Sequence, residues 1–443
     1  MGRLFGTDGV RGLAGTELDR DLAFGLGRAA VEVLGRHGVG HPTFVVGRDT
    51  RASGEWLEDA LVEGIRSGGG DAVLAGVEPT PAIAFLTIDR GASSGVVISA
   101  SHNPPAYNGI KFFAANGMKL PDALEEEIEA ALGAPPAAGP ARGETMPSGD
   151  ARHRYLDHLV AAAEAPLDGM TVVVDCANGA ASDVAPEMLR RLGATVHAIH
   201  ASPDGTNING ACGALYPEVV AAEVVRTGAD AGVTHDGDAD RALFADATGA
   251  IVDGDQVLAA CAVAMKEAGR LAADTVVTTV MANVGFHHAM REAGIEVVAS
   301  KVGDRYVLEE MLRTGASLGG EQSGHVIFRD FATTGDGLLT AARFLSLSAA
   351  RGVSVRELAG VMRRYPQALV NVHVRDRDSL QEAEPVWEAA RVVEERLGEE
   401  GRVLIRPSGT EPIVRVMVEA GTEELATTNA AALADVVRSS MGS

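Results

Sequence analysis

The sequence is poor in cysteine, in aromatic residues and in basic residues. Its three cysteines, at positions 176, 212 and 261 of 443, lie far apart and in no metal-ligand spacing. This usage is typical of reduced, buried thiols in a cytosolic protein. Lys and Arg number 38 against 61 Asp and Glu, a net charge of −23. Such an acidic excess argues against a nucleic-acid partner, although local basic residues can still bind a phosphorylated small molecule.

Long hydrophobic runs are absent as well. No stretch approaches the run of about 20 apolar residues that a membrane-spanning helix needs. The N-terminal segment MGRLFGTDGVRG has no apolar core of the signal-peptide type. We therefore expect a cytoplasmic protein with no membrane partner. Hydrophobic residues still make up 46% of the chain, and its length predicts about two to four globular domains.

Short apolar strands alternate with helical patterns along most of the chain, which predicts an α/β fold. We expect three α/β units at residues 1–152, 153–252 and 253–364, followed by a smaller α+β unit at residues 365–443. The GxGxxA string at residues 25–30 lies inside a helical pattern and follows no strand. We therefore do not interpret it as a dinucleotide-binding loop.

A local pattern recurs in the first three units. A Gly-Ala pair with a second glycine four residues after the first begins at Gly91, Gly228 and Gly315. Each copy follows a helical pattern and precedes a short segment that ends in a polar loop. The recurrence predicts related tandem domains; chance repetition in a chain rich in Gly and Ala is the alternative. Since ligands of open α/β sheets gather beyond the carboxyl ends of the strands, we expect the three loops to face one cleft.

The first polar loop, residues 99–109, joins two apolar runs. Its Ser101 is followed directly by His102, and Lys111 lies ten residues further on. A serine on a stiff loop beside an imidazole and a cation suits a covalent nucleophile. The alternative is an ordinary polar loop in which His102 only braces the turn and Lys111 is a strand-edge lysine.

The second polar loop is DGDADR at residues 236–241, and it carries Asp236, Asp238 and Asp240 at alternating positions. Three carboxylates this close repel one another unless a cation neutralises them. The EF-hand pattern fails, because its glycine and glutamate positions are Arg241 and Ala247. Mg²⁺ is favoured over Ca²⁺ because it combines a few carboxylates with phosphate oxygens. The alternative is a solvated acidic turn.

Two further loops carry groups that suit a sugar phosphate. GEQSGH at residues 320–325 places Glu321 and Ser323 two residues apart, which in an extended segment directs both side chains to the same side. The alternative is a polar hairpin tip with a structural His325. The loop IRPSGTEP at residues 405–412, followed by Arg415, offers guanidinium, hydroxyl and backbone N–H groups to a phosphate; here an ordinary turn is the alternative.

Five motifs together resemble one family. FGTDGVRG, SASHNP, DGDADR, GEQSGH and RPSGTEP occur in this order over nearly the whole chain, as in the α-D-phosphohexomutases. The strings GTNINGACG, VDGDQ and TTVMANVGFH favour members that act on glucosamine phosphates. Two departures are SAS where many members have TAS, and the ending ALYPE of the loop at residues 205–218. The resemblance implies three similar α/β domains with mixed sheets around a central cleft, and a smaller C-terminal α+β domain.

The resemblance also implies roles for individual residues. Ser101 would carry the phosphoryl group, and one Mg²⁺ per chain would bind Asp236, Asp238, Asp240 and a phosphoserine oxygen. Glu321 and Ser323 would hold sugar hydroxyls. The non-reacting phosphate would be held by Arg406, Ser408, Gly409, Thr410 and Arg415. Proton transfer or charge stabilisation would fall to Arg11, Lys111, His102 and His325, and Arg241 is a further candidate site residue.

The activity implied by the resemblance is that of an isomerase. Glucosamine 6-phosphate and glucosamine 1-phosphate would interconvert through glucosamine 1,6-bisphosphate, which also acts as activator, and the product would feed UDP-N-acetylglucosamine and cell-wall precursor synthesis. A kinase or the bisphosphate would first phosphorylate Ser101, and a homodimer is compatible with this reading. The alternatives are a phosphomannomutase or phosphoglucomutase, a phosphoserine-dependent hydrolase, and a non-catalytic sugar-phosphate-binding protein.

Overall fold

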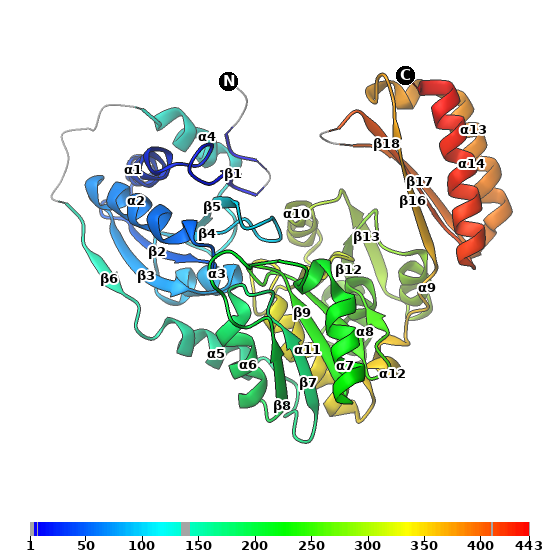
Figure 1. Cartoon of the computed structure of the whole chain (residues 1–443), viewed down its shortest axis with the longest axis horizontal. Coiled ribbons are helices and arrows are strands. Elements are labelled where there is room, and N and C mark those ends of the chain that lie inside the picture. The colour runs from blue at the N-terminus through cyan, green and yellow to red at the C-terminus, as the bar shows by residue number, and fades with distance from the viewer. Residues whose placement is uncertain (1–3, 7, 134–141, 409–410, 443) are drawn as a thin grey trace. The chain divides into compact units, whose positions relative to one another are not determined.

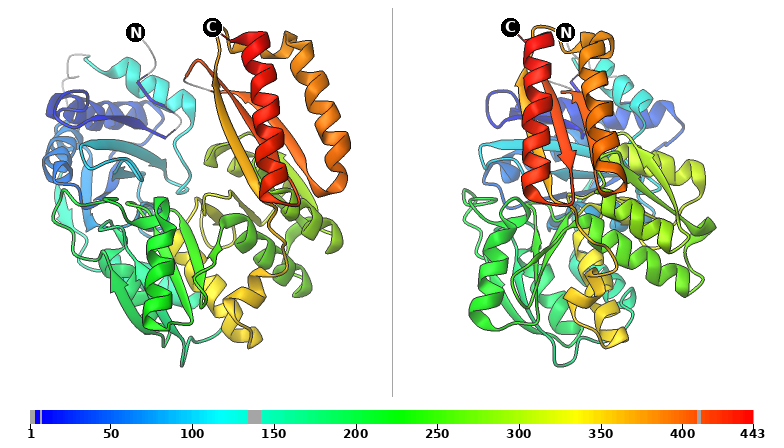
Figure 2. Two further views of the ribbon diagram at one scale, coloured as in Figure 1. Left: turned by 45° about the vertical axis from the view of Figure 1, so that its right-hand side comes forward. Right: turned by 90° about the vertical axis from the view of Figure 1, so that its right-hand side faces the viewer.

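The structure, a computed structural model, describes residues 4–6, 8–133, 142–408 and 411–442. The chain divides into two compact units (Figures 1 and 2). The first consists of Met1–Met281 and Ile295–Gly360, and the second of Ala282–Gly294 and Val361–Ser443. No helix among the described residues is long and apolar enough to cross a membrane.

The N-terminal part of the first unit contains a six-stranded mixed sheet in the order β1-β5-β4-β2-β3-β6. Helices α1 and α2 pack so closely at Gly27 that a Cβ there would lie 2.3 Å from the Leu61 carbonyl oxygen. The GxGxxA string is therefore a helix–helix contact, as its helical setting predicted. The elements are β1 (Val10–Leu13), α1 (Arg20–Arg36), β2 (Thr43–Arg48), α2 (Ser53–Ser67), β3 (Asp71–Val77), α3 (Thr80–Asp89), β4 (Ser94–Ile98), β5 (Tyr107–Ala114), α4 (Asp122–Ala131) and β6 (Thr145–Pro147).

The second sheet of this unit has five strands in the order β11-β10-β9-β7-β8. Its central strands are fully buried runs of small and β-branched residues, as a strand covered on both faces requires. The elements are α5 (Ala151–Ala161), β7 (Thr171–Asp175), α6 (Ala181–Arg191), β8 (Thr195–Ile199), α7 (Pro217–Thr227), β9 (Ala231–His235), β10 (Ala242–Asp246) and β11 (Ile251–Val252).

The third sheet has four strands in the order β13-β12-β14-β15. Helix α11 begins with an Asp336 cap, whose carboxylate accepts the Leu339 N–H at 2.9 Å. The elements are α8 (Gly254–Glu267), β12 (Thr275–Thr279), β13 (Glu296–Ser300), α10 (Asp304–Thr314), β14 (Leu318–Gly320), β15 (Val326–Phe328), α11 (Gly337–Arg351) and α12 (Val355–Ala359).

The three sheets share one local topology, which confirms the expectation of related domains. In each sheet, one strand pairs in parallel with a neighbour on one side and antiparallel with the next strand of the chain on the other. These strands are β4 between β2 and β5, β9 between β7 and β10, and β14 between β12 and β15. The three Gly-Ala repeats precede the first strands of these hairpins, β4, β9 and β14. The three polar loops are therefore the equivalent β4–β5, β9–β10 and β14–β15 connections.

The second unit contains an antiparallel three-stranded sheet in the order β16-β18-β17. Helices α13 and α14 lie side by side against this sheet, drawn in orange and red in Figure 2. The α+β order expected for this part of the chain is confirmed. The elements are α9 (Val284–Glu292), β16 (Gln367–His373), α13 (Glu384–Leu397), β17 (Arg402–Pro407), β18 (Ile413–Glu419) and α14 (Glu423–Met441).

Candidate active site

Ser101 follows strand β4 and faces the aspartate loop of the second sheet. Its Oγ donates a hydrogen bond to Asp236 Oδ2 at 2.6 Å and lies 3.3 Å from His102 Nδ1. Its backbone has a left-handed φ of 49°, a conformation that costs energy for a residue with a Cβ. The Ser101 N–H donates to Ser99 Oγ at 3.0 Å, which helps to hold this turn. The predicted nucleophile is thus buried, strained and directed at a carboxylate.

A buried arginine supports the serine loop from behind. Both terminal nitrogens of Arg51 donate to backbone carbonyl oxygens, at 2.9 Å to Ser101, 2.8 Å to Asn103, 2.5 Å to Pro104 and 3.0 Å to Tyr107. Only a planar guanidinium with several fixed N–H groups can serve four carbonyls in this way. The shape of the loop therefore depends on one side chain from the loop that follows β2.

The three aspartates of the second loop lie together and are buried. One carboxylate oxygen from each of Asp236, Asp238 and Asp240 lies within 4.8 Å of the other two. Oδ1 of Asp238 and Oδ1 of Asp240 have no hydrogen-bond partner among the described residues. Buried carboxylate oxygens without partners are the donors that a hard divalent cation requires. The set fits Mg²⁺.

The protonation of the three carboxylates reflects their crowding. Burial and the neighbouring Asp238 raise the pKa of Asp236 to about 6, and burial with both neighbours raises that of Asp240 to about 8. Burial also acts on Asp238, but the Lys111 ammonium and the Thr80 hydroxyl hold its pKa below the usual range. Asp238 is therefore a fixed negative charge, and a bound cation would lower the raised pKa values of its two neighbours.

The serine loop and the aspartate loop touch at Gly237. A Cβ on this residue would lie 2.6 Å from the Ser101 carbonyl oxygen and 2.9 Å from Asn209 Nδ2. Asn209 Nδ2 itself donates to the Ser101 carbonyl oxygen at 2.8 Å. The glycine between Asp236 and Asp238 therefore lets the two loops approach closely enough for the Ser101–Asp236 hydrogen bond.

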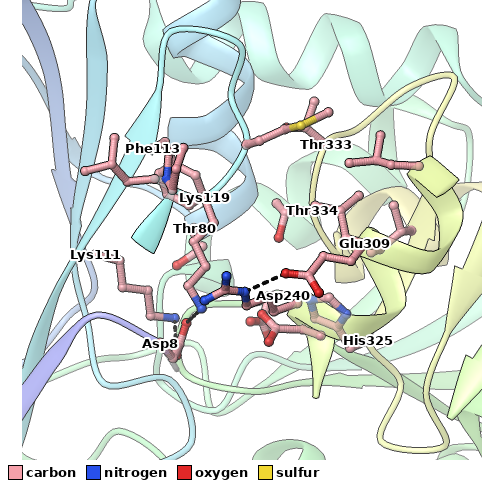
Figure 3. Close-up of a pocket in the computed structure, with 18 of the residues that line it drawn as sticks. Asp8, Thr80, Lys111, Phe113, Lys119, Asp240, Glu309, His325, Thr333 and Thr334 are labelled. Carbon is pink, nitrogen blue, oxygen red and sulfur yellow. Dashed lines mark hydrogen bonds and ion pairs between the residues drawn. The ribbon is translucent and has the colours of Figure 1, made fainter. Parts of the chain in front are cut away.

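Several cations surround this centre, and Asp8 joins three of them. Lys111 Nζ lies 3.0 Å from Asp8 Oδ2 and 3.1 Å from Asp238 Oδ2. Lys119 Nζ lies 3.3 Å from Asp8 Oδ1, and Arg11 also pairs with Asp8. Figure 3 shows Asp8 and Lys111 facing the same space as Asp240 and His325. Positive charge is thus concentrated where a phosphoryl group would carry negative charge.

The two histidines of the site differ in their surroundings. Burial, Arg241 and Arg11 lower the pKa of His102 to about 4, so its ring is neutral near pH 7. His325 is buried, and neither of its ring nitrogens has a hydrogen-bond partner among the described residues. Its ring packs against Gly335, where a Cβ would lie 2.3 Å from the ring atoms. His102 therefore presents a neutral ring beside Ser101 Oγ, and His325 presents two ring nitrogens to the site.

The GEQSGH segment departs from the extended form expected for it. Residues 322–323 form a turn between β14 and β15, which Gly324 closes with a φ of 89°. Glu321 and Ser323 nevertheless remain neighbours, with Ser323 Oγ 3.5 Å from Glu321 Oε2. The extended-strand argument was wrong, because a hairpin connection this short has to reverse the chain.

Two adjoining cavities of about 270 Å³ each connect these groups. The first is lined by residues of all three domains, including Asp8, Lys111, Asp240 and His325. The second brings together predicted residues from the three repeated loops and from the N-terminal segment. Its lining includes Arg11, Ser101, His102, Asp240, Arg241, Glu321 and His325.

The predicted phosphate loop belongs to the second unit. Arg406 on β17 and Arg415 on β18 are directly opposite partners in the sheet. Burial and the neighbouring Arg415 charge lower the pKa of Arg406. Ser408 is buried, and its N–H donates to the Ile413 carbonyl oxygen at 2.9 Å. Gly409 and Thr410 lie outside the described residues.

Sequence reasoning gave no role to several residues that shape the site. Thr80 donates to Asp238 Oδ2 at 2.6 Å, and Asn209 and Arg51 hold the serine loop. Asp8 stands in the motif FGTDGVRG, and Arg51 stands in none of the motifs. Asn209 lies within the string GTNINGACG and Thr80 lies outside every motif, and no local pattern points to the partners of these last two. Their partners are more than 100 residues away, so only the fold reveals these contacts.

Comparison with known proteins matches all four parts of the chain. The four descriptions are those of the phosphoglucomutase/phosphomannomutase alpha/beta/alpha domains I, II and III and C-terminal domain, at residues 2–136, 153–249, 253–365 and 369–436. A phosphoglucosamine mutase of Frankia casuarinae is 54% identical over 451 aligned residues, which cover 100% of this chain and 99% of the relative.

Solved structures agree with this match. A phosphoglucomutase/phosphomannomutase family protein of Burkholderia thailandensis is 26% identical with a TM-score of 0.81, over 99% of this chain and 97% of that one. The N-acetylphosphoglucosamine mutase of Aspergillus fumigatus, solved with GlcNAc-6P and magnesium, is 19% identical with a TM-score of 0.65, over 82% and 92%. At that identity the second likeness shows the fold alone.

The three hairpin loops, the buried serine and the aspartate cluster define a phosphoryl-transfer enzyme of the phosphohexomutase class. The chain belongs to the phosphoglucomutase/phosphomannomutase family, the α-D-phosphohexomutases, which are isomerases. The resemblance stated from the five sequence motifs is therefore confirmed, as is the fold class of three similar α/β domains and a smaller α+β domain.

Proposed function

We propose that this isomerase interconverts glucosamine 6-phosphate and glucosamine 1-phosphate through a phosphoserine at Ser101. The observation that carries the proposal is the hydrogen bond of 2.6 Å between Ser101 Oγ and Asp236, within a cluster of three buried aspartates. A phosphoryl group on this oxygen would adjoin the predicted metal site. The full-length identity of 54% to a phosphoglucosamine mutase supports the choice of an amino sugar as substrate.

The reaction runs in two transfers. The phosphoryl group leaves Ser101 Oγ, which takes up a proton, and bonds to the free sugar hydroxyl oxygen. The hydroxyl proton passes to a nearby base, and glucosamine 1,6-bisphosphate forms. After the bisphosphate turns over, its other phosphoryl group returns to Ser101 Oγ and the second sugar phosphate leaves. Lys111, His102 and His325 are the candidate bases, while Arg11 and Lys111 stabilise negative charge. Such transfers depend on in-line placement and charge neutralisation.

The metal and substrate contacts complete the proposal. Asp236, Asp238 and Asp240 would hold one Mg²⁺ per chain, which when bound neutralises charge on the phosphoryl oxygens. Glu321 and Ser323 bind sugar hydroxyls, and Arg241 adds positive charge beside the aspartates. The non-reacting phosphate is held by Arg406, Ser408, Gly409, Thr410 and Arg415.

At the level of the whole protein, the proposal includes four domains, a source of the first phosphoryl group and a cellular setting. We place the domain boundaries at residues 1–152, 153–252, 253–364 and 365–443, which the four matched ranges support. Glucosamine 1,6-bisphosphate or an upstream kinase would supply the first phosphoryl group. The enzyme works in the cytoplasm on a small-molecule substrate, without nucleic acid or membrane, and a homodimer is compatible with this role. Its product supplies UDP-N-acetylglucosamine and cell-wall precursor synthesis.

Mass spectrometry of the intact protein and its peptides, before and after exposure to the sugar bisphosphate, tests the phosphoserine. We expect one phosphoryl group on Ser101, and none in Ser101→Ala, which should also lose turnover while still binding the sugar phosphate. A phosphoryl group on any other residue would overturn the assignment.

Product analysis separates the alternative activities. Release of inorganic phosphate instead of the isomeric sugar phosphate would indicate a hydrolase. Faster turnover of glucose or mannose phosphates than of glucosamine phosphate would indicate a phosphoglucomutase or phosphomannomutase. Retained ligand binding without any turnover in the wild type would indicate a binding protein.

A further inference from the structure

A second group of metal-ligating side chains lies in the second domain, outside the three-aspartate cluster. Asp175 ends strand β7, His200 follows the neighbouring strand β8, and Cys212 precedes a short 3₁₀ turn. One ligand atom from each of these residues lies within 4.8 Å of the other two. Three different donor types from three separate segments thus converge beyond the carboxyl ends of two parallel strands.

The spacing of two of these donors matches a metal centre. His200 Nδ1 and Asp175 Oδ1 are 3.1 Å apart. Neighbouring ligands of a tetrahedral Zn²⁺ with bonds of about 2.0 Å are about 3.3 Å apart. The imidazole and the carboxylate therefore need little movement to become adjacent ligands.

The carboxylate is held in place by the backbone. Asp175 Oδ1 accepts the Ala177 N–H and Oδ2 accepts the Gly213 N–H, each at 3.0 Å. Oδ1 also contacts His200 Nδ1, and a cation between the two groups would replace that contact. Hydrogen bonds from the backbone commonly orient metal-ligating carboxylates. The Asp175 side chain is fully buried, whereas His200 is 35% exposed. A cation can therefore enter from the His200 side, where water can supply a fourth ligand.

The donor chemistry selects the class of cation. A thiol, an imidazole and one carboxylate suit Zn²⁺ or a similar borderline-soft ion, whereas Mg²⁺ prefers oxygen ligands. One thiolate and one carboxylate also balance the two charges of such an ion.

We propose that Asp175, His200 and Cys212 form a binding site for Zn²⁺ or a similar divalent transition metal, distinct from the three-aspartate site. Two of its ligands, His200 and Cys212, are the first and last residues of the segment 200–212. Asn209, in the same segment, donates to the carbonyl oxygens of Ser101 at 2.8 Å and Asn103 at 3.1 Å. Occupation of the site therefore stiffens a segment that holds the serine loop.

Cobalt titration tests the site on the full-length protein. The protein is stripped with a chelator, supplied with excess Mg²⁺ to fill the aspartate cluster, and titrated with Co²⁺. We expect a thiolate-to-cobalt charge-transfer absorption that saturates at one equivalent and that Zn²⁺ abolishes by replacing the cobalt. Absence of this absorption in the wild type would overturn the proposal.

Variants identify the ligands. Cys212→Ser should abolish the absorption, and His200→Asn should weaken Co²⁺ binding at least about tenfold, because even residues behind a ligand contribute that much. Cys261→Ser and Cys176→Ser are the matched controls and should retain the signal. Persistence of the absorption in Cys212→Ser would refute the site. If that variant does not fold, the test is His200→Asn, at a partly exposed residue, and unchanged Co²⁺ affinity in that variant would refute the site.

Hydrogen exchange tests the effect on the loop. Zn²⁺ should slow amide hydrogen exchange at residues 200–213 in the wild type and should not change the exchange rates of these residues in His200→Asn. Equal exchange with and without Zn²⁺ in the wild type would refute the stiffening.

Discussion

At the scale of single residues, Arg51 illustrates how much one side chain can fix. Arg51→Lys keeps the charge but cannot reach four carbonyls at once, so charge-assisted hydrogen bonds to the serine loop are lost, and Asn209 remains as a donor to the Ser101 and Asn103 carbonyl oxygens. We expect a loss of at least about 2 kcal/mol in unfolding free energy and a fall in kcat of about 100-fold from misplacement of Ser101. Thermal unfolding and steady-state kinetics measure the two effects.

The matched control for this substitution is Arg36→Lys. Arg36 is 52% exposed and pairs only with Glu32 on the same helix, so its change should stay within about 0.5 kcal/mol. Equal effects of the two substitutions would show that the serine loop does not depend on Arg51.

Thr80 is a second single residue with an identifiable partner, the Asp238 carboxylate. Its hydroxyl donates to Asp238 Oδ2, so Thr80→Val removes a group that orients a proposed metal ligand. We expect the Mg²⁺ concentration for half-maximal activity to rise about 10–100-fold. Thr87→Val is the control, because Thr87 is equally buried in the same helix but bonds only to the Ile83 carbonyl oxygen. An unchanged Mg²⁺ requirement in Thr80→Val would contradict this role.

The sequence revealed some of these residues and not others for a physical reason. Ser101 and the three aspartates stand out because their chemistry is concentrated in a few consecutive positions. Arg51 and Thr80 act on atoms 50 or more residues away. A side chain that serves distant backbone or carboxylate oxygens leaves no local pattern.

At the scale of elements, the close approach of the serine and aspartate loops depends on Gly237. Gly237→Ala introduces a Cβ only 2.6 Å from the Ser101 carbonyl oxygen, so the two loops must separate. We expect loss of the Ser101–Asp236 hydrogen bond and a fall in kcat of about 100-fold. The rate at which the sugar bisphosphate phosphorylates Ser101, measured by mass spectrometry, should fall together with kcat.

Gly35→Ala provides the comparison for this steric effect. Gly35 lies in helix α1, and a Cβ there would meet no atom within 4 Å. Its replacement should leave activity unchanged and stabilise the protein by about 0.5–1 kcal/mol. A Gly237→Ala enzyme of wild-type activity would show that the two loops can move apart without consequence.

Periodicity predicted many elements well. The α/β alternation along the chain agrees with the three mixed sheets, and the helical setting of residues 25–30 agrees with helix α1. For GEQSGH the alternative, a polar hairpin tip, is the form that the structure shows, because six residues are too few for periodicity to separate an extended segment from a tight hairpin.

At the scale of the whole molecule, Glu78 of the first domain is linked to the second domain through Arg152, which also donates to Asp183 at 2.9 Å. Glu78 follows β3, and its Oε1 lies 3.0 Å from Arg152 Nε of α5. Burial raises the pKa of Glu78 to about 7, above its usual 4.5. The folded protein thus binds a proton here that the unfolded chain has released. This contribution to stability is complete below about pH 4.5 and is lost as the pH rises through about 7.

The Glu78→Gln variant measures this contribution. Glutamine does not titrate, so the Tm of the variant relative to the wild type should rise by several degrees between pH 5 and pH 8, equivalent to about 2–3 kcal/mol. Glu63→Gln, at a side chain that is 45% exposed, should show no such trend. A constant or falling difference for Glu78→Gln would contradict the raised pKa.

The sequence by itself determined the class of fold, the order of the motifs and the chemical groups each loop carries, because strand and helix periods and clustered polar residues are properties of neighbouring positions. The tertiary structure decided which groups meet. The 2.6 Å contact of Ser101 with Asp236, the shared bond of Lys111 with Asp8 and Asp238, and the convergence of Asp175, His200 and Cys212 each join segments far apart in the chain. Such contacts depend on the packing of whole sheets, which local sequence does not encode.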